Sequence, residues 1–128
     1  MSDRRAVHTP DAPDALGPYS QAVVACGLVH CSGQIGLDPA SGEFVEGDVT
    51  AQAERVLANL CAVLEAAGSG IECVLKCNVY LADLADFAAV NEVYARTFEG
   101  DAPPARACIE ARLPKGALIE IDCVALAR

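Results

Sequence analysis

Four polar side chains alternate with apolar ones in the stretch Ala105–Arg112, which reads ARACIEAR. With a repeat of two residues, one side of such a strand carries Arg106, Cys108, Glu110 and Arg112. A guanidinium can hold a carboxylate through two parallel hydrogen bonds, and a positioned carboxyl can move protons. The stretch therefore indicates either a solvated sheet face with cross-strand ion pairs or the floor of a site.

Two acids and one amide elsewhere in the chain could join this polar side. Glu120 and Asp122 alternate with the apolar residues of 118–127 and belong to the polar side of the last predicted strand. The predicted helix has an apolar stripe formed by Phe87, Val90, Tyr94 and Phe98, and Asn91 lies beside it, four residues after Phe87. An amide there must find partners or serve a site. Alternation alone favours the solvated face, and Asn91 fits a satisfied buried amide equally well.

Hydrophobic periodicity predicts the elements that hold these residues. Short strands are expected at 21–24 and 27–36, followed by a turn rich in Asp, Pro, Ser and Gly at 38–44. Between 48 and 67 the apolar residues recur at helical spacing, with Asp48 as the N-cap and glycine at 68 as the stop.

The second half of the chain repeats the change from strand to helix. Residues 74–81 alternate as a half-buried strand with Leu75 on the apolar side, and a helix follows from 83 to 100. The segments 105–113 and 118–127 flank a Pro-Lys-Gly turn and predict a β-hairpin. This order indicates an α+β fold with two helices on one face of a mostly antiparallel sheet.

Length and charge limit the class of protein. The 128 residues suit a single domain over 1–128 with one hydrophobic core. A net charge of −9 opposes binding to nucleic acid, and no apolar run is long enough to cross a membrane. Residues 1–16 read as a partly ordered arm without a secretory signal, so a cytoplasmic location is expected.

The seven cysteines predict neither a metal site nor a redox pair. They form an odd set with no C-x-x-C spacing and no neighbouring histidines. Most lie in apolar runs, where a free thiol behaves as a small hydrophobic side chain. All except Cys108 are therefore expected in the core, and no metal or other cofactor is expected.

Several motifs together resemble the Rid/YjgF family of reactive-intermediate deaminases. They are GPYSQAV (17–23), SGQIGLDPASGE (32–43), NLCAVLEAAG (59–68), VYLADLADFAAVNEVYARTF (79–98), PPARACIE (103–110) and LPKGALIEID (113–122). The resemblance implies a homotrimer of chorismate-mutase-like subunits with sites in the clefts between subunits. It also implies hydrolysis of 2-imino acids, or their enamine tautomers, to 2-keto acids and ammonia without a cofactor.

The resemblance also assigns the site. The implied residues are all present: Tyr19, Ser32, Gly33, Asn91, Arg106, Cys108 and Glu120. Arg106 would hold the substrate carboxylate, Glu120 would act as general acid or base, and Cys108 would line the site rather than attack. Leu113 follows Arg106 by seven positions, one fewer than in many members, which puts the facing of the intervening residues Glu110 and Arg112 in question.

The predicted hairpin adds a distance argument. If its turn centres near Lys115–Gly116, Glu120 lies opposite about residue 111, roughly five positions from Arg106 or about 15 Å. Both could not then hold one small imino acid within a single chain. The spacing therefore predicts that the two come from different subunits.

Three functions are compatible with these sequence features to different degrees. The favoured one is deamination of 2-iminobutanoate and 2-iminopropanoate. The second is a non-enzymatic trimer that binds 2-keto acids or regulates in response to them. A ribonuclease or translation inhibitor is disfavoured by the charge of −9 and the lack of a basic patch. The pattern does not distinguish which imine is preferred.

Overall fold

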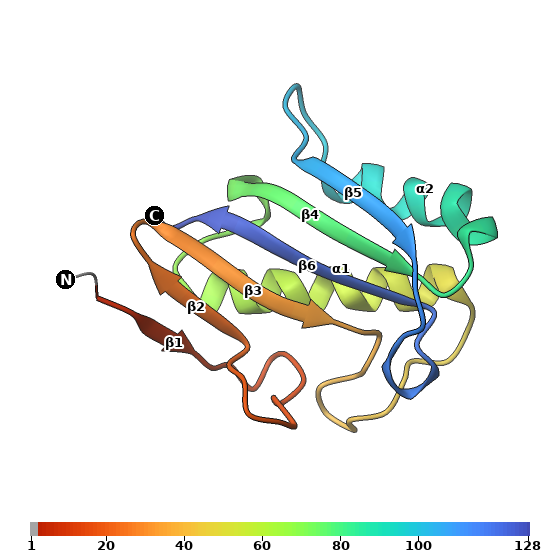
Figure 1. Cartoon of the computed structure of the whole chain (residues 1–128), viewed down its shortest axis with the longest axis horizontal. Coiled ribbons are helices and arrows are strands. Elements are labelled where there is room, and N and C mark those ends of the chain that lie inside the picture. Colours follow the sequence, from red (N-terminus) through yellow and green to blue (C-terminus); the bar gives the residue numbers. More distant parts are fainter. Residues whose placement is uncertain (1–2) are drawn as a thin grey trace.

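A computed structural model describes residues 3–128 and shows one six-stranded sheet with two helices on one face (Figure 1). The strand order is β1-β2-β3-β6-β4-β5. The strands are β1 Arg5–Val7, β2 Ala22–Ala25, β3 Leu28–Gln34, β4 Val74–Leu81, β5 Ala105–Glu110 and β6 Ile119–Leu126. Only β4 and β5 pair in parallel, and the other four pairings are antiparallel. The predicted α+β class and mostly antiparallel sheet are confirmed.

The first helix, α1 (Val49–Ala66), forms where the periodicity predicted it. The Asp48 carboxylate accepts hydrogen bonds from the backbone N–H groups of Thr50 and Ala51, at 3.0 and 3.4 Å, and so caps the helix. Gly68 follows the helix with a φ of 80°, a conformation that favours glycine. The second helix, α2 (Phe87–Thr97), follows a short 3₁₀ turn, η2 (Leu84–Asp86), and is shorter than predicted.

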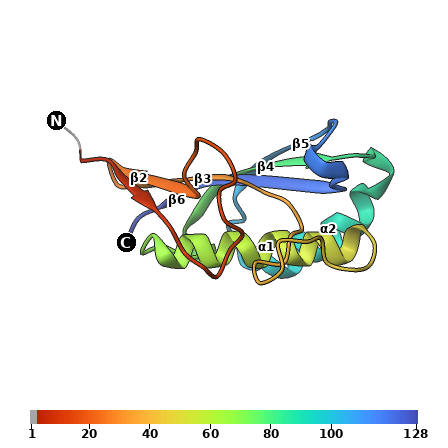
Figure 2. The same ribbon diagram turned by 90° about the horizontal axis from the view of Figure 1, so that it is seen from below.

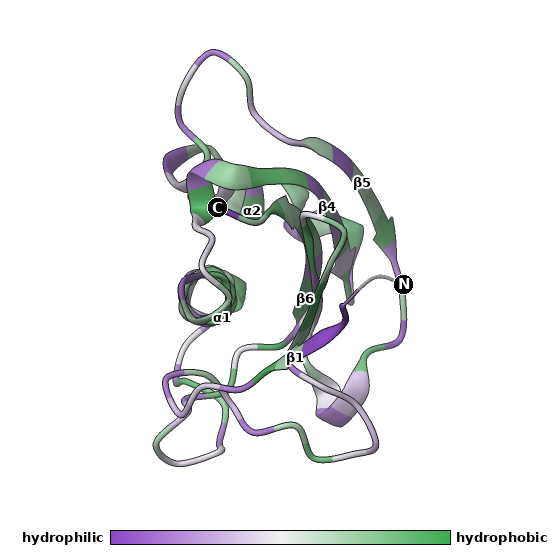
Figure 3. Ribbon diagram, turned by 90° about the vertical axis from the view of Figure 1, so that its left-hand side faces the viewer, coloured by the Kyte–Doolittle hydropathy of each residue, from purple (hydrophilic) through white to green (hydrophobic). Residues whose placement is uncertain are grey.

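The two α-helices of residues 3–128 cover the same face of the sheet, and neither lies on the other face (Figure 2). The sheet curves around them, so that its covered face is concave (Figure 3). The core fills this layer with small and branched apolar side chains, including Val29, Val56, Leu60, Leu64, Ile119 and Ile121. Neither helix of the described chain has the length and apolarity to span a membrane.

The predicted hairpin between residues 105–113 and 118–127 is wrong. Strand β6 pairs with β3 and β4, whereas β5 pairs only with β4. The unit β4-α2-β5 is a strand-helix-strand crossover, which joins parallel strands. Alternation showed that both segments are strands, but it carries no information on which strands are neighbours.

Three further expectations are corrected. The arm contains a strand, β1, which pairs with β2 at the sheet edge. Leu75 is 43% exposed instead of facing the core, because the register shifts between Val74 and Lys76 and buries Val74. Cys26 is exposed in the β2–β3 turn, whereas the other cysteines are buried or half-buried.

Candidate functional site

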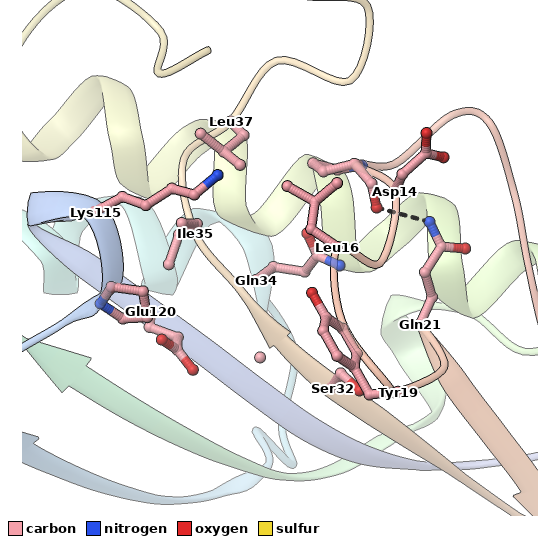
Figure 4. A pocket seen from close by; sticks show the side chains of 13 residues that line it. Asp14, Leu16, Tyr19, Gln21, Ser32, Gln34, Ile35, Leu37, Lys115 and Glu120 are labelled. Atoms are coloured by element: carbon pink, nitrogen blue, oxygen red, sulfur yellow. Dashed lines mark hydrogen bonds between the residues drawn. The ribbon is translucent and has the colours of Figure 1, made fainter. Parts of the chain in front are cut away.

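Four of the predicted site residues line one cleft at the ends of β3 and β6. Tyr19, Ser32, Gly33 and Glu120 surround a cavity of about 420 Å³ (Figure 4). Apolar side chains complete its walls: Leu16, Ile35, Leu37, Pro13 and Pro114. The volume is at the lower end of what small-molecule sites in proteins provide.

Gly33 makes room for the Glu120 carboxylate. A Cβ atom on residue 33 would overlap Glu120 Oε2. The register shift between Cys31 and Gln34 places this glycine where β3 passes β6. A Cβ atom at position 33 would force the Glu120 carboxylate to shift, and glycine allows this close approach.

The surroundings of Glu120 favour its protonated form. Burial raises the pKa of the Glu120 carboxyl, and the negative charge of Asp122 raises it further. Within residues 3–128 the carboxylate accepts no hydrogen bond. A carboxyl with a raised pKa and unoccupied lone pairs is suited to exchange protons with a ligand.

Asp122 is held in place by its neighbours on β4. Asn78 Nδ2 donates to Asp122 Oδ1 at 2.8 Å, and the Tyr80 hydroxyl donates to Oδ2 at 3.0 Å. This hydrogen bond is the main reason that the pKa of Tyr80 is raised. Asp122 therefore acts as a fixed negative charge beside Glu120.

The N-terminal arm forms the outer wall of the cleft because Gln21 anchors it. The buried Gln21 amide accepts a hydrogen bond from Thr9 N and donates to the carbonyl oxygens of Thr9 and Pro13. The Ser32 hydroxyl donates to Ser20 O at 2.6 Å, which fixes the chain next to Tyr19. Tyr19 itself is 54% exposed and stands over the cavity.

Arg106 lies elsewhere, against α2. Its Nη1 donates to Asn91 Oδ1 at 2.7 Å. The guanidinium carbon lies 4.8 Å from the centre of the Tyr94 ring and 5.4 Å from that of Phe87, distances typical of cation–π contacts. Asn91 and the two rings thus orient the guanidinium, which remains exposed toward a groove of about 590 Å³.

Cys108 follows Arg106 on the same side of β5 and is half-buried. Burial raises the pKa of its thiol, although the Arg106 charge opposes this effect. A thiol that stays protonated is a poor nucleophile. The raised pKa therefore fits a lining role better than covalent catalysis.

Glu110 and Arg112 do not join the cleft. The pairing of β5 with β4 continues without a register shift to Glu110, so the missing residue falls in the loop after the strand. Glu110 Oε1 accepts a hydrogen bond from Leu84 N, and Arg112 is exposed beyond the end of β5.

The site residues lie on opposite faces of the sheet, and the prediction of one shared polar face is wrong. Arg106 is in register with Cys77, whose side chain is buried under the helices, whereas Glu120 is opposite Tyr80 on the uncovered face. The two residues are two strands apart, about 10 Å across the sheet and about 10 Å along it. A single chain therefore cannot place both on one small substrate.

A family model described as Endoribonuclease L-PSP matches residues 9–127. The chain belongs to this family, the YjgF/Rid family. Protein DfrA of Myxococcus xanthus is 56% identical over 96% of this chain and 95% of its own length. The 2-iminobutanoate/2-iminopropanoate deaminase of Homo sapiens is 46% identical over 96% and 90%.

A solved structure shows the same fold. The crystal structure of E. coli TdcF with bound serine has a TM-score of 0.91 and 38% identity, with 97% of this chain and 99% of that chain covered. The relatives carry different names, so membership of the YjgF/Rid family fixes the fold more closely than the activity.

Two features of the site were not predicted from the sequence. Phe87 and Tyr94 hold Arg106, although both were assigned to the apolar stripe of the helix. Their spacing with Asn91, at i, i+4 and i+7, places all three on one helix face and was the available signal. The second feature is Lys115, which lines the cleft next to Glu120.

Proposed function

We propose that the protein hydrolyses 2-imino acids such as 2-iminobutanoate and 2-iminopropanoate to 2-keto acids and ammonia. The observation that carries the proposal is Glu120, which lines a small cleft and has a raised carboxyl pKa, together with an arginine oriented by Asn91 and two rings. These are the groups that a carboxylate and a hydrolysable C=N bond require. The human relative named for this reaction supports the assignment.

In the proposed reaction Arg106 holds the substrate carboxylate and Glu120 handles the protons. Ionised Glu120 takes a proton from water, the water oxygen bonds to C2, and the C=N electron pair moves to nitrogen. The nitrogen takes that proton back from Glu120, which gives a carbinolamine. Its hydroxyl proton then passes through Glu120 to the nitrogen, the C–N bond breaks, and ammonia leaves as the C2=O bond forms. A protonated imine is already electrophilic, so we expect the reaction to proceed without a metal.

The proposed active unit is a homotrimer whose sites combine residues of two copies. One copy would supply Arg106, and the next would supply Tyr19, Ser32, Gly33 and Glu120. The position of the two sets on opposite faces of one sheet supports this arrangement. The uncovered sheet face is the surface that a second copy would occupy.

Mixing of two inactive variants tests both the chemistry and the assembly. Arg106→Ala and Glu120→Gln should each lose imine hydrolysis, measured on imines generated in situ by an amino-acid oxidase. When the two are co-expressed, random trimers contain intact sites made from the arginine of one variant and the glutamate of the other. About a quarter of the wild-type activity should return.

The outcome separates the possible failures. Activity retained by Arg106→Ala alone would refute the assignment of the carboxylate-binding residue. If co-assembled variants stay inactive although light scattering shows mixed oligomers, the two residues do not combine across copies. If the wild type binds 2-ketobutyrate but never accelerates imine hydrolysis, the protein is a 2-keto acid-binding member of the family.

A further inference from the structure

Lys115 has an unusual backbone conformation for a lysine. Its φ is 58° and its ψ is 19°, in the left-handed region that residues with a Cβ atom adopt at a cost. The loop around it is fixed from both sides. Ala117 N donates to Pro114 O at 3.0 Å, and Leu118 N donates to the Gln52 side chain, also at 3.0 Å. The fold thus holds a strained lysine at one defined place.

That place is the wall of the cleft. Lys115 projects over the cavity between Leu37 and Glu120 (Figure 4). Among the residues of the described chain that line the cleft, it is the single basic one. Arg106 cannot substitute for it within the same chain, because Arg106 faces α2 on the other side of the sheet.

The Lys115 ammonium group has no protein partner within residues 3–128. The chain has 18 acidic residues against nine Lys and Arg, so an exposed lysine has many possible partners. Among the described residues, Arg128 forms an ion pair with Glu72, and His8 would form one with Asp14 when its imidazole is protonated. Lys115 and Glu120 line the same cavity but form no ion pair with each other. The cleft therefore keeps a positive and a negative group apart.

We infer that Lys115 is a carboxylate-binding residue of this cleft. A 2-imino acid carries a carboxylate next to a nitrogen that gains positive charge on protonation. Its carboxylate matches Lys115 at the wall, and its nitrogen matches Glu120 at the floor. Lys115 and Arg106 of a second copy then hold the same carboxylate, Lys115 from the wall of the cleft and Arg106 from the facing copy. This role rests on the proposed function, which supplies the substrate class.

Binding of 2-ketobutyrate, the stable product analogue, tests the role of Lys115 without depending on turnover. In Lys115→Met the dissociation constant, measured by calorimetry on the full oligomeric protein, should rise about fivefold at low salt. KM for 2-iminobutanoate should rise by a similar factor with kcat unchanged. Lys115→Arg should restore both values, since it keeps the charge.

Two further variants exclude trivial explanations. Lys115→Gly removes the charge and relaxes the left-handed backbone, so it should fold at least as well as the wild type and still bind weakly. Arg96→Met removes one positive charge from the exposed side of α2, away from the cleft, and should leave binding unchanged.

The results distinguish this inference from the proposed function. Wild-type binding of 2-ketobutyrate in both Lys115→Met and Lys115→Gly would overturn the role of Lys115, even if the wild type hydrolyses imines. Conversely, weak binding in both variants would uphold it, even if the wild type proves inactive on every imine.

Discussion

At the scale of single residues, the proposed chemistry depends on how Glu120 is surrounded. Partial burial is the larger cause of the raised pKa of the Glu120 carboxyl, and the fixed negative charge of Asp122 adds to the effect. Asp122 cannot turn away from Glu120, because Asn78 and Tyr80 hold both of its carboxylate oxygens. The pKa of Glu120 can therefore be changed through Asp122 without touching Glu120 itself.

Replacement of Asp122 by asparagine should shift the pH dependence of hydrolysis. The substitution removes the negative charge that raises the pKa of Glu120, so that pKa falls toward its ordinary value near 4.5. The rate should then be lost at a lower pH as the solution is acidified, because Glu120 stays ionised longer. The measurement is the pH profile of kcat/KM.

A matched charge change serves as the control for Asp122→Asn. Asp101→Asn also removes one negative charge, but from an exposed loop. The fall of kcat/KM at acidic pH should coincide with that of the wild type. If the acidic part of the kcat/KM profile is also unchanged in Asp122→Asn, Glu120 does not control the rate.

At the scale of elements, α1 fixes the segment that leads out of β3 along the cleft. The Asn59 side chain is fully buried, and its Nδ2 donates to Leu37 O at 3.0 Å and to Ile35 O at 3.3 Å. Its Oδ1 accepts from Arg55 Nε at 2.9 Å. Since Ile35 and Leu37 are walls of the cleft, a buried helix side chain determines the shape of the site.

Asn59→Ala should lower the free energy of unfolding by about 2 kcal/mol, because it leaves buried carbonyl groups without a donor and opens a small cavity. Urea unfolding at one fixed protein concentration measures this, since the stability of an oligomer depends on concentration. Glu54→Ala, on the exposed side of α1, should change it by less than about 0.5 kcal/mol. Equal effects of the two variants would argue against the anchoring role of Asn59.

At the scale of the whole molecule, the sheet face opposite the helices is the surface proposed for assembly. It carries the apolar residues Leu28, Val124 and Leu126 beside polar ones such as Lys76 and His30. On the edge strand β5 the side chain of Ile109 belongs to the same face and is 52% exposed. An exposed isoleucine on the side of a strand that no helix covers is what an interface between copies would use.

Ile109→Asp should therefore reduce the proposed homotrimer to smaller species and lower imine hydrolysis together. The free energy of unfolding of the single chain should change little, because position 109 is already exposed and the substitution buries no charge. Light scattering after size-exclusion chromatography reports the mass. Ala58→Glu places a charge on the exposed side of α1 and should leave the mass unchanged. An intact oligomer in Ile109→Asp would place the interface elsewhere.

Local sequence patterns were sufficient to predict most of the helices and strands. The spacing of apolar residues identified α1 and its cap at Asp48, and alternation located β4 and β6. These features depend on neighbours a few residues apart, which the sequence records directly. β1 was missed because three residues are too few to establish a repeat of two.

The sequence by itself determined that Arg106 and Cys108 share one side of a strand, that Glu120 and Asp122 share one side of another, and that the chain resembles a known family. Only the tertiary structure decided that the two sides face in opposite directions. Alternation states which residues lie together, but not which face the helices cover. On β5 the polar side packs against α2 and the apolar side stays open. That reversal separates Arg106 from Glu120 in one chain.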